Sequence, residues 1–568
     1  MRVVRRLREL SISNLVVILA VLFFLSNSFW VLSDNRLPMI GDDARFLQGT
    51  YELYTPVAQG DFEEAWDNWQ NMFIHPDRFP RTPLFAALSV PTFLIFGVSE
   101  NAAIFTNLAV LATNSYLIML LVRELFPKLP RRKYAAAVLG SVLAYNLLPG
   151  VFSFGRLYMS ETLQTFFVLL MSWMLIKYKK TSSPKVFLAL GFILGLSWLL
   201  RYIMPLYLVV PLAVFGWQQI RQKESPGTYI KRIAAVLLGF VPVALTWYGQ
   251  NFETYTEFAR FTSSGELSQY YSLGPVFSLR TIGRFWYVIV TWMFGWPFMV
   301  FSFVTGGLWA LFFGRNSFGR VVEFIKDRKL SLWERKDRLA ANPIVYLALI
   351  PVPTLLALTL SDGKTARYFV PVMIFWVILV AVKAADLAFS KKTAGKVWMK
   401  ILLVAALLPV AYIYDYTVLR FLPALPLTGQ SPAARPWDGS MESAAHERYD
   451  FFYEVFEKNM SSDGSLRIYN TAEQPQFNDA ELIWYGTERG YHLFNTHEFS
   501  RYSDVDEGRS QINGADVVIV ESTPEVGELW EDKYRQIREY VTGGDRFVLL
   551  SERAMSDGSE MQIFITVN

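Results

Sequence analysis

Long apolar runs without a single acidic or basic residue recur along this chain, and they limit its possible folds. Such runs include Leu15 to Phe29, Ala135 to Phe152 and Ile344 to Leu360. Their lengths approach the ~20 residues that a helix needs to span a bilayer. Because 52% of the 568 residues are hydrophobic and only 18% are charged, the composition excludes an ordinary soluble enzyme. A polytopic membrane protein is indicated.

The charge of the chain is divided unevenly between its two parts. From Arg420 onward there are 13 Lys and Arg residues against 26 Asp and Glu, whereas the preceding part holds 41 against 24. The two parts are therefore expected to face different surroundings. The chain has no cysteine, which excludes disulfides, thiolate metal sites and a cysteine nucleophile.

The charges that flank the apolar runs predict how the chain threads the membrane. With the amino terminus inside, the inner loops hold 29 Lys and Arg residues, and the outer loops of the membrane part hold 11. Since positive charges gather on the cytoplasmic side, this asymmetry favours eleven crossings. The block 186–217 fits two short helices broken near Arg201 and Pro205, although one long tilted helix is the alternative. The predicted spans cover about 13–32, 101–122, 135–154, 162–176, 186–200, 203–217, 233–249, 286–313, 344–360, 368–387 and 401–418.

The two parts are predicted to be a membrane domain over residues 1–419 and an extracytoplasmic α/β domain over 420–568, joined by a linker at 423–436 rich in Pro, Gly, Ser and Ala. Short β-rich runs predict strands in the second domain, and apolar residues at helical spacing predict helices. The strands are expected at 466–469, 517–520, 547–550 and 563–567, and the helices at 446–458 and 528–541.

The first outer loop, residues 33–100, is a candidate for surface chemistry. Its segment Ser33 to Thr82 holds nine acidic and four basic residues, among them Asp42, Asp43 and Arg45. Adjacent carboxylates beside an arginine could bind a divalent metal, act as a general base or hold a cationic substrate. The alternative is a solvated loop that turns into a helix with Asp42 as its N-cap. The apolar stretch 83–98 is too short for a clear span and is predicted to lie on the outer surface.

Further ionisable residues fall on the same predicted outer face. They suit an anionic leaving group and a nucleophile that must lose a proton. An arginine at a span end can equally be an anchor that snorkels to the interface. These residues are Arg81, Glu161, Arg201, Arg260 and Arg367.

Motifs of soluble enzymes are missing. The sequence Gly363-Lys364-Thr365 resembles the end of a P-loop, but Leu358 stands where the first glycine is required. None of the four histidines forms an HExxH motif. The acidic surplus in the second part argues against nucleic acid as a partner.

An ordered series of short motifs resembles the GT-C-fold glycosyltransferases of the lipid-A aminoarabinose transferase and protein O-mannosyltransferase type. Asp42-Asp43-Ala44-Arg45-Phe46 is similar to the family's Asp-Glu-x-x-Tyr pattern, although Asp43 and Phe46 depart from it. The resemblance covers about residues 1–400. Its other carriers are Arg81-Thr82-Pro83-Leu84, the Leu94 to Ser99 turn, Glu161, Gly195 to Arg201, Asn251 to Phe261, and Arg367-Tyr368-Phe369-Val370-Pro371.

This resemblance implies transfer of a sugar from a polyprenyl phosphate to a lipid, glycan or protein acceptor. The transfer would take place at the outer face of the inner (plasma) membrane, with inversion. Asp42 would be the base or would orient the acceptor, and Asp43 and Glu161 are the further catalytic candidates. A divalent metal ion on these three carboxylates is possible. The residues expected to bind the donor are Arg45, Arg81, Arg201, Arg260, Arg367 and Tyr368.

Membrane lipid is a further expected partner, since stretch 83–98 and the helix ends would line a groove for the polyprenyl chain. Two rival functions remain. A transporter or flippase of a lipid-linked sugar would share the apolar helices and the outward charges, but it predicts internal repeats and ionisable groups at mid-membrane. The second rival is a non-catalytic membrane scaffold whose outer domain binds a partner. Retention of the protein's activity after the outer acidic residues are neutralised would favour it.

Overall fold

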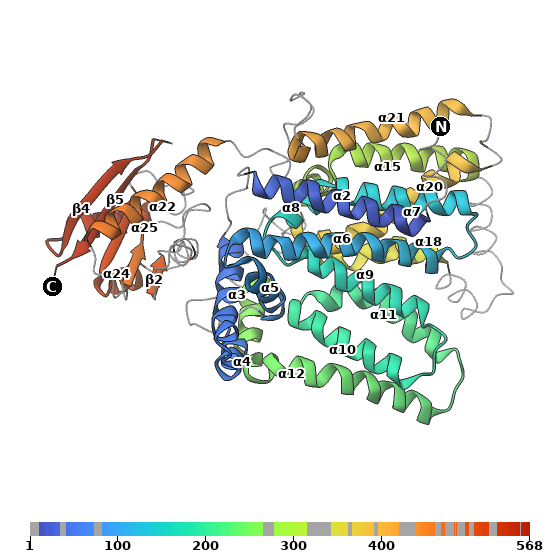
Figure 1. Ribbon diagram of the computed structural model, residues 1–568, viewed down its shortest axis with the longest axis horizontal. Helices are drawn as coiled ribbons and strands as arrows, with labels where there is room; N and C mark the ends of the chain where they lie inside the picture. The colour runs from blue at the N-terminus through green and yellow to red at the C-terminus, as the bar shows by residue number, and fades with distance from the viewer. Residues whose placement is uncertain are drawn as a thin grey trace. The chain divides into compact units, whose positions relative to one another are not determined.

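The structure is a computed structural model of the whole chain, and most of its described residues are helical (Figure 1). Two compact units emerge from it. The first comprises residues 1–34, 66–88 and 104–435, and the second comprises 35–65, 89–103 and 436–568. The described residues are 11–33, 41–72, 82–264, 278–314, 342–361, 366–390, 393, 396–419, 439–459, 467–471, 482, 484, 495–498, 505–521, 531–556 and 558–567.

The first unit is a bundle of helices, many of which run roughly along one direction (Figure 1). Helix α20 (Val370–Phe389) lies at its centre and packs against α7, α9, α15 and α18. The other helices are α2 (Ile12–Leu32), α6 (Glu100–Leu125), α7 (Arg131–Leu147), α8 (Pro149–Arg156), α9 (Glu161–Lys177), α10 (Pro184–Leu200), α11 (Met204–Ile220), α12 (Pro226–Ser264), α14 (Leu279–Val288), α15 (Trp296–Trp309), α18 (Pro343–Leu349), α19 (Pro351–Leu360) and α21 (Val397–Tyr414).

Within the described residues, seven helices are long and apolar enough to cross a membrane, or up to eight if the bent pair α7 and α8 is one span. All eleven predicted spans coincide with helices, but α10 and α11 are shorter apolar helices. Helix α9, with 17 residues, is also shorter than the helices counted as long enough to cross. The predicted break between two helices in block 186–217 is confirmed, since α10 ends at Leu200 and α11 begins at Met204. The total of eleven crossings stays a prediction.

Two predicted spans are not continuous helices in the structure. The span at 135–154 bends by 60° between α7 and α8, where Pro149 begins the second helix. Proline is favoured at the start of a helix and cannot continue the preceding one. The span at 286–313 is interrupted at Gly295, whose φ of +73° lies in a region that residues other than glycine rarely adopt. Of the described helices there, Trp296–Phe313 is long and apolar enough to cross a membrane.

The outward surface of several helices in this unit is apolar. On α12, Ile233, Leu237, Leu238 and Leu245 are each more than half exposed. Large contiguous apolar surfaces are unusual on soluble proteins, but they are the normal surface of a helix in lipid. The exposed side chains therefore agree with a multi-pass membrane protein.

Helices α10 and α12 pack closely because glycines face each other. A Cβ atom at Gly191 would overlap the carbonyl oxygen of Val236, and one at Gly239 would overlap the carbonyl oxygen of Leu188. Small residues let the backbones of two membrane helices approach closely. This contact holds α10 against α12, and Arg201 is the residue that follows the end of α10.

The second unit contains a five-stranded sheet in the order β2-β1-β3-β5-β4. Strand β1 pairs in parallel with β2 and β3, whereas β5 pairs antiparallel with β3 and β4. The described helices of this unit include α3 (Gly41–Gln59), α22 (Gly439–Asn459), α24 (Val505–Asn513) and α25 (Glu531–Thr542), and it shares parts of α4 (Phe62–Asn71), α5 (Leu84–Phe96) and α6. The strands are β1 (Arg467–Asn470), β2 (Asn495–Glu498), β3 (Val517–Glu521), β4 (Phe547–Ala554) and β5 (Glu560–Thr566).

Helices cover both faces of this sheet. Val517 and Ile519 belong to one hydrophobic cluster with Phe452 of α22, and Val518 and Val520 belong to a second cluster with Ile537 of α25. Because successive residues of a strand point to opposite faces, β3 is buried throughout. The predicted α/β domain is thus confirmed, while β2 and α24 were missed. The predicted linker at 423–436 lies outside the described residues.

Candidate functional site

A buried carboxylate begins helix α9. Glu161 is the first residue of α9, and its side chain is 0% exposed. The preceding Ser160 is also buried, and its hydroxyl accepts a hydrogen bond from Nε2 of Gln164 at 2.9 Å. A buried carboxylate is costly unless cations or hydrogen-bond donors lie against it. The partners of Glu161 therefore decide how this site works.

The first partner is Arg201, at the break between α10 and α11. Its backbone is extended, with φ −167° and ψ 141°, so α10 ends there. The Nη1 atom of Arg201 lies 3.2 Å from Oε1 of Glu161 and donates to the hydroxyl of Ser160, also at 3.2 Å. The helix break thus turns an arginine of an apolar segment toward the buried carboxylate.

The second partner is Arg367, in the 3-10 turn Ala366–Phe369 that leads into α20. Its Nε atom lies 3.6 Å from the same oxygen of Glu161, and its Nη1 donates to the sulfur of Met159 at 3.6 Å. The adjacent Tyr368 ties the two arginines together. Its hydroxyl accepts from Nη2 of Arg201 at 3.4 Å, and its ring centroid lies 5.0 Å from the Arg201 guanidinium and 5.5 Å from that of Arg367.

The four residues Glu161, Arg201, Arg367 and Tyr368, here called the arginine cluster, carry two positive charges and one negative charge. The arginine side chains are 16% and 18% exposed, whereas the carboxylate is fully buried. The exposed side of the cluster is therefore cationic. Guanidinium groups bind phosphate through two parallel hydrogen bonds, so this arrangement can receive a phosphate group.

The second oxygen of the carboxylate is a further feature. Oε2 of Glu161 is buried and accepts no hydrogen bond from any residue that the structure describes. Native proteins leave few buried polar atoms in this state, and those that occur often mark a place where a ligand or water binds. Oε2 can accept a hydrogen bond from a hydroxyl of a bound molecule.

Sequence reasoning missed Tyr207, which is fully buried in α11. It lies close enough to interact electrostatically with Glu161, Arg201 and Tyr368. Its hydroxyl has no hydrogen-bond partner among the described residues. A tyrosine six positions after Arg201 in an otherwise apolar helix was the signal that could have identified it.

The remaining predicted site residues belong to other segments of the chain. Asp43 and Arg45 lie in α3 of the second unit, where Asp43 is 1% exposed and Arg45 is half-buried. Arg260 is exposed near the end of α12. Asp42 belongs to the first turn of α3, but its side chain is outside the part that the structure describes. Arg81 lies outside the described residues altogether. The roles of these five residues stay predictions.

No described group of three His, Asp or Glu side chains could hold a metal ion. Since Asp42 is outside this description, the possible divalent metal on Asp42, Asp43 and Glu161 also stays a prediction. Glu161 already has two guanidinium partners, which compete with a metal for the same oxygen.

Comparison with known proteins adds a sequence match and a fold match. Residues 75–247 match the family model described as dolichyl-phosphate-mannose-protein mannosyltransferase. No curated protein matches the sequence. The fold is similar to that of ArnT from Cupriavidus metallidurans bound to undecaprenyl phosphate, with a TM-score of 0.54, 15% identity, and coverage of 96% of this chain and 97% of that one.

Two further structures are similar to this chain. The apo state of the same ArnT gives a TM-score of 0.53 at 15% identity, with 97% of this chain and 98% of that chain covered. An oligosaccharyltransferase from Archaeoglobus fulgidus gives a TM-score of 0.46 at 12% identity, over 90% of this chain and 67% of that chain. The ArnT likeness shows the fold. The chain therefore shares its fold with this membrane-bound ArnT, and part of its sequence matches a mannosyltransferase family.

The sequence match adds a more particular likeness. It begins before α5, runs to Trp247 in α12 and includes Glu161 and Arg201. Within that stretch the chain is similar to protein mannosyltransferases that use dolichyl phosphate mannose. Arg367 and Tyr368 lie beyond the match and join the cluster only through the fold.

Proposed function

We propose that this protein transfers a sugar from a polyprenyl-phosphate donor to a lipid, glycan or protein acceptor, with inversion at the anomeric carbon. One observation carries the proposal: the buried Glu161 holds two guanidinium groups, those of Arg201 and Arg367, in one cationic cluster. Undecaprenyl phosphate in the similar ArnT structure supports this donor class. The partial match to a mannosyltransferase family supports a sugar as the transferred group.

The reaction makes a specific electrostatic demand. An acceptor hydroxyl or amine attacks the anomeric carbon, a new bond forms there, and the bond from this carbon to the phosphate oxygen breaks. The electron pair of the broken bond leaves with the polyprenyl phosphate, which gains negative charge, and the acceptor's proton passes to a base. Fixed cations beside the departing oxygen stabilise that charge as it develops.

The arginine cluster suits the leaving-group side of this reaction. Arg201 and Arg367 would bind the phosphate, and Tyr368 would keep the two guanidinium groups apart and oriented. Glu161 would position the arginines through Oε1, and its free Oε2 would accept a hydrogen bond from a sugar hydroxyl. In this proposal Glu161 contacts the sugar and does not accept the proton of the acceptor.

The acceptor side rests on residues of the first predicted outer loop. Asp42 would take the proton from the acceptor or orient it, and Asp43 would assist, directly or through a shared divalent metal ion. Arg45, Arg81 and Arg260 would add positive charge along the path of the donor. Carboxylates are required here because a neutral acceptor is a weak nucleophile until its proton is removed.

The membrane and the face at which transfer occurs follow from the distribution of charge along the chain. The protein would lie in the inner (plasma) membrane, and the reaction would occur at its outer face, where the charge asymmetry puts the first loop. The α/β domain would also lie outside and would cover or select the acceptor. The lipid tail of the donor would run along the apolar helices.

Undecaprenyl phosphate is a suitable probe for testing this proposal. Purified wild-type protein should retain the lipid in native mass spectrometry, and the lipids that co-purify should include polyprenyl phosphates that carry a sugar. The Arg201→Gln variant keeps hydrogen-bond donors but loses the charge, so retention should fall about tenfold. As a control, Arg280→Gln removes an exposed arginine of α14 and should leave retention unchanged. Equal retention in all three proteins would contradict the proposed donor site.

A further inference from the structure

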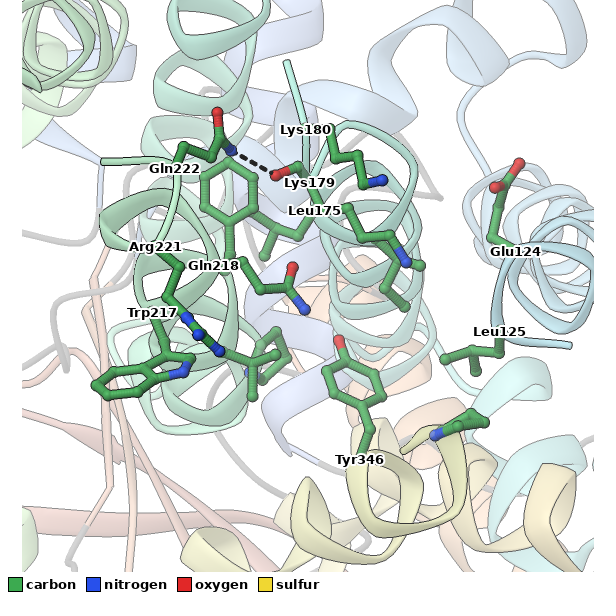
Figure 2. Close-up of a pocket in the computed structure, with 15 residues that line it drawn as sticks. Glu124, Leu125, Leu175, Lys179, Lys180, Trp217, Gln218, Arg221, Gln222 and Tyr346 are labelled. Atoms are coloured by element: carbon green, nitrogen blue, oxygen red, sulfur yellow. Dashed lines mark hydrogen bonds between the residues drawn. The ribbon is translucent and has the colours of Figure 1, made fainter. Parts of the chain in front are cut away.

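A cavity lies at the other end of the helices that carry the arginine cluster. It has a volume of about 460 Å³ and is lined by residues at the carboxyl ends of α6, α9 and α11 and at the start of α18 (Figure 2). Its polar lining includes Lys179, Lys180, Gln218 and Arg221. Nothing in the proposed glycosyl transfer uses these residues.

The cavity is remote from the arginine cluster. Glu161 is the first residue of α9 and Lys177 is the last, so the two sites are separated by the length of a 17-residue helix. At 1.5 Å per residue this length is ~25 Å, close to the ~30 Å hydrocarbon thickness of a bilayer. The cavity therefore belongs to the opposite membrane face, which the charge distribution predicts to be cytoplasmic.

The charge that lines the cavity is mainly positive. Three of its lining residues, Lys179, Lys180 and Arg221, are cationic, and Glu124 is the one acidic residue among those that line it. Among the described residues, the side chains of Lys179 and Lys180 form no hydrogen bond or ion pair, and both are exposed. The backbone carbonyl of Lys179 instead accepts from Gln219 and Gln222, at 2.8 and 3.0 Å, which anchors this segment against α11.

Neighbouring cations behave differently. Arg232 is buried and forms an ion pair with Glu224, and Lys177 packs over the ring of Trp173 at 4.5 Å. Their charges are engaged within the protein. At the cavity, by contrast, an anion can meet the two ammonium groups of Lys179 and Lys180 at once.

The remaining lining is apolar. Leu125, Leu175, Ile176 and Phe215 form part of the wall, and Trp217 lies near Arg221 at the edge of the cavity (Figure 2). Tryptophan is enriched at the level of lipid headgroups. A free phosphate ion would leave this wall uncovered, whereas a phospholipid matches it with its acyl chain and glycerol.

We propose that this cavity binds an anionic phospholipid of the facing leaflet, with the headgroup phosphate on Lys179, Lys180 and Arg221 and the start of an acyl chain against the wall formed by Leu175 and Phe215. Basic pockets between membrane helices recognise anionic headgroups in this way. The bound lipid would connect the ends of α9 and α11, the two helices that position Glu161 and Tyr207 at their other ends.

The test compares two matched double variants of the full-length protein. Lys179→Gln with Lys180→Gln removes two charges from the cavity. Lys185→Gln with Lys231→Gln removes two exposed charges at the starts of α10 and α12, which do not line it. Delipidated proteins are titrated with dioleoyl phosphatidylglycerol, dioleoyl phosphatidylcholine or inorganic phosphate, and binding is followed by native mass spectrometry. Melting temperatures, which should match the wild type because all four lysines are exposed, are measured in parallel.

The wild type should bind phosphatidylglycerol more tightly than phosphatidylcholine, and millimolar inorganic phosphate should not displace it. The cavity variant should lose about tenfold in affinity for phosphatidylglycerol, while the matched control stays within about twofold of wild type. Equal losses in both variants would show general surface attraction and overturn the proposal. Displacement by inorganic phosphate would also overturn it, in favour of a free phosphate site.

Discussion

Glu161, Arg201 and Arg367 act as one unit at the scale of single residues. One carboxylate oxygen lies 3.2 Å from the first guanidinium and 3.6 Å from the second. Removing one member of such a buried set leaves the others with unbalanced charge, so single substitutions combine a local loss with a structural cost. Conservative substitutions are therefore the informative ones.

The first prediction concerns Arg367. Lysine keeps the charge but loses the planar group that spans Glu161 and the proposed phosphate, so Arg367→Lys should lower the transfer rate about tenfold. Arg367→Ala should lower it about a hundredfold or more. Turnover of a polyprenyl-phosphate sugar by the purified variants gives the ranking. An arginine that only anchors a helix would tolerate lysine fully, and that result would remove Arg367 from the site.

The second prediction concerns Asp42. Asparagine has nearly the same volume but cannot accept a proton, so Asp42→Asn should lower transfer about 10² to 10⁴-fold while the donor still binds. Binding of undecaprenyl phosphate is measured beside turnover to separate the two effects. Asp67→Asn, an exposed carboxylate of α4, is the matched control and should keep its activity. Near-normal turnover of Asp42→Asn would rule out this base.

At the scale of elements, the contact between α10 and α12 determines where Arg201 is held. The third prediction is that Gly239→Ala destabilises the protein by about 1–3 kcal/mol, because the added methyl group overlaps the backbone of α10. Gly216→Ala is the control, since the methyl group at that helical position of α11 meets no atom within 4 Å. It should be neutral or slightly stabilising, because alanine favours helix more than glycine does.

Thermal unfolding in detergent measures both glycine variants. A lower melting temperature for Gly239→Ala alone is the expected result. If both variants unfold at the wild-type temperature, then α10 and α12 have room to separate and the close approach is not required. The transfer rate of Gly239→Ala should fall as well, since a displaced α10 moves Arg201 away from Glu161.

For the whole molecule, the threading through the membrane is the main open prediction. The chain lacks cysteine, so a single introduced cysteine reports its own location. In intact cells an impermeant thiol reagent should label Met460→Cys and should not label Lys326→Cys, because the charge count puts residue 460 outside and residue 326 inside. Labelling at 326 but not at 460 would reverse the orientation and, with it, the face at which transfer is proposed.

The division of this molecule into secondary structure could be predicted well from local patterns. The apolar runs marked all seven described helices that are long and apolar enough to cross a membrane, and β-rich runs marked four of the five described strands of the sheet. The missed elements, β2 and α24, are short and polar, with sequences Asn-Thr-His-Glu and Val-Asp-Glu-Gly-Arg-Ser-Gln-Ile-Asn. They depend on pairing and packing for their formation, and so they leave little local signal.

The class of molecule, a multi-pass membrane protein, could be predicted from hydrophobic length and charge alone, because both act through the solvent and do not depend on the fold. The sequence also identified Glu161, Arg201, Arg367 and Tyr368 as separate candidates. That these four residues meet is visible only in the folded chain, because the contacts join residues 40 positions apart from Glu161 to Arg201 and 167 apart from Arg201 to Tyr368. Such contacts depend on how helices pack and break, through features such as the glycines of α10 and α12, and no local pattern encodes them.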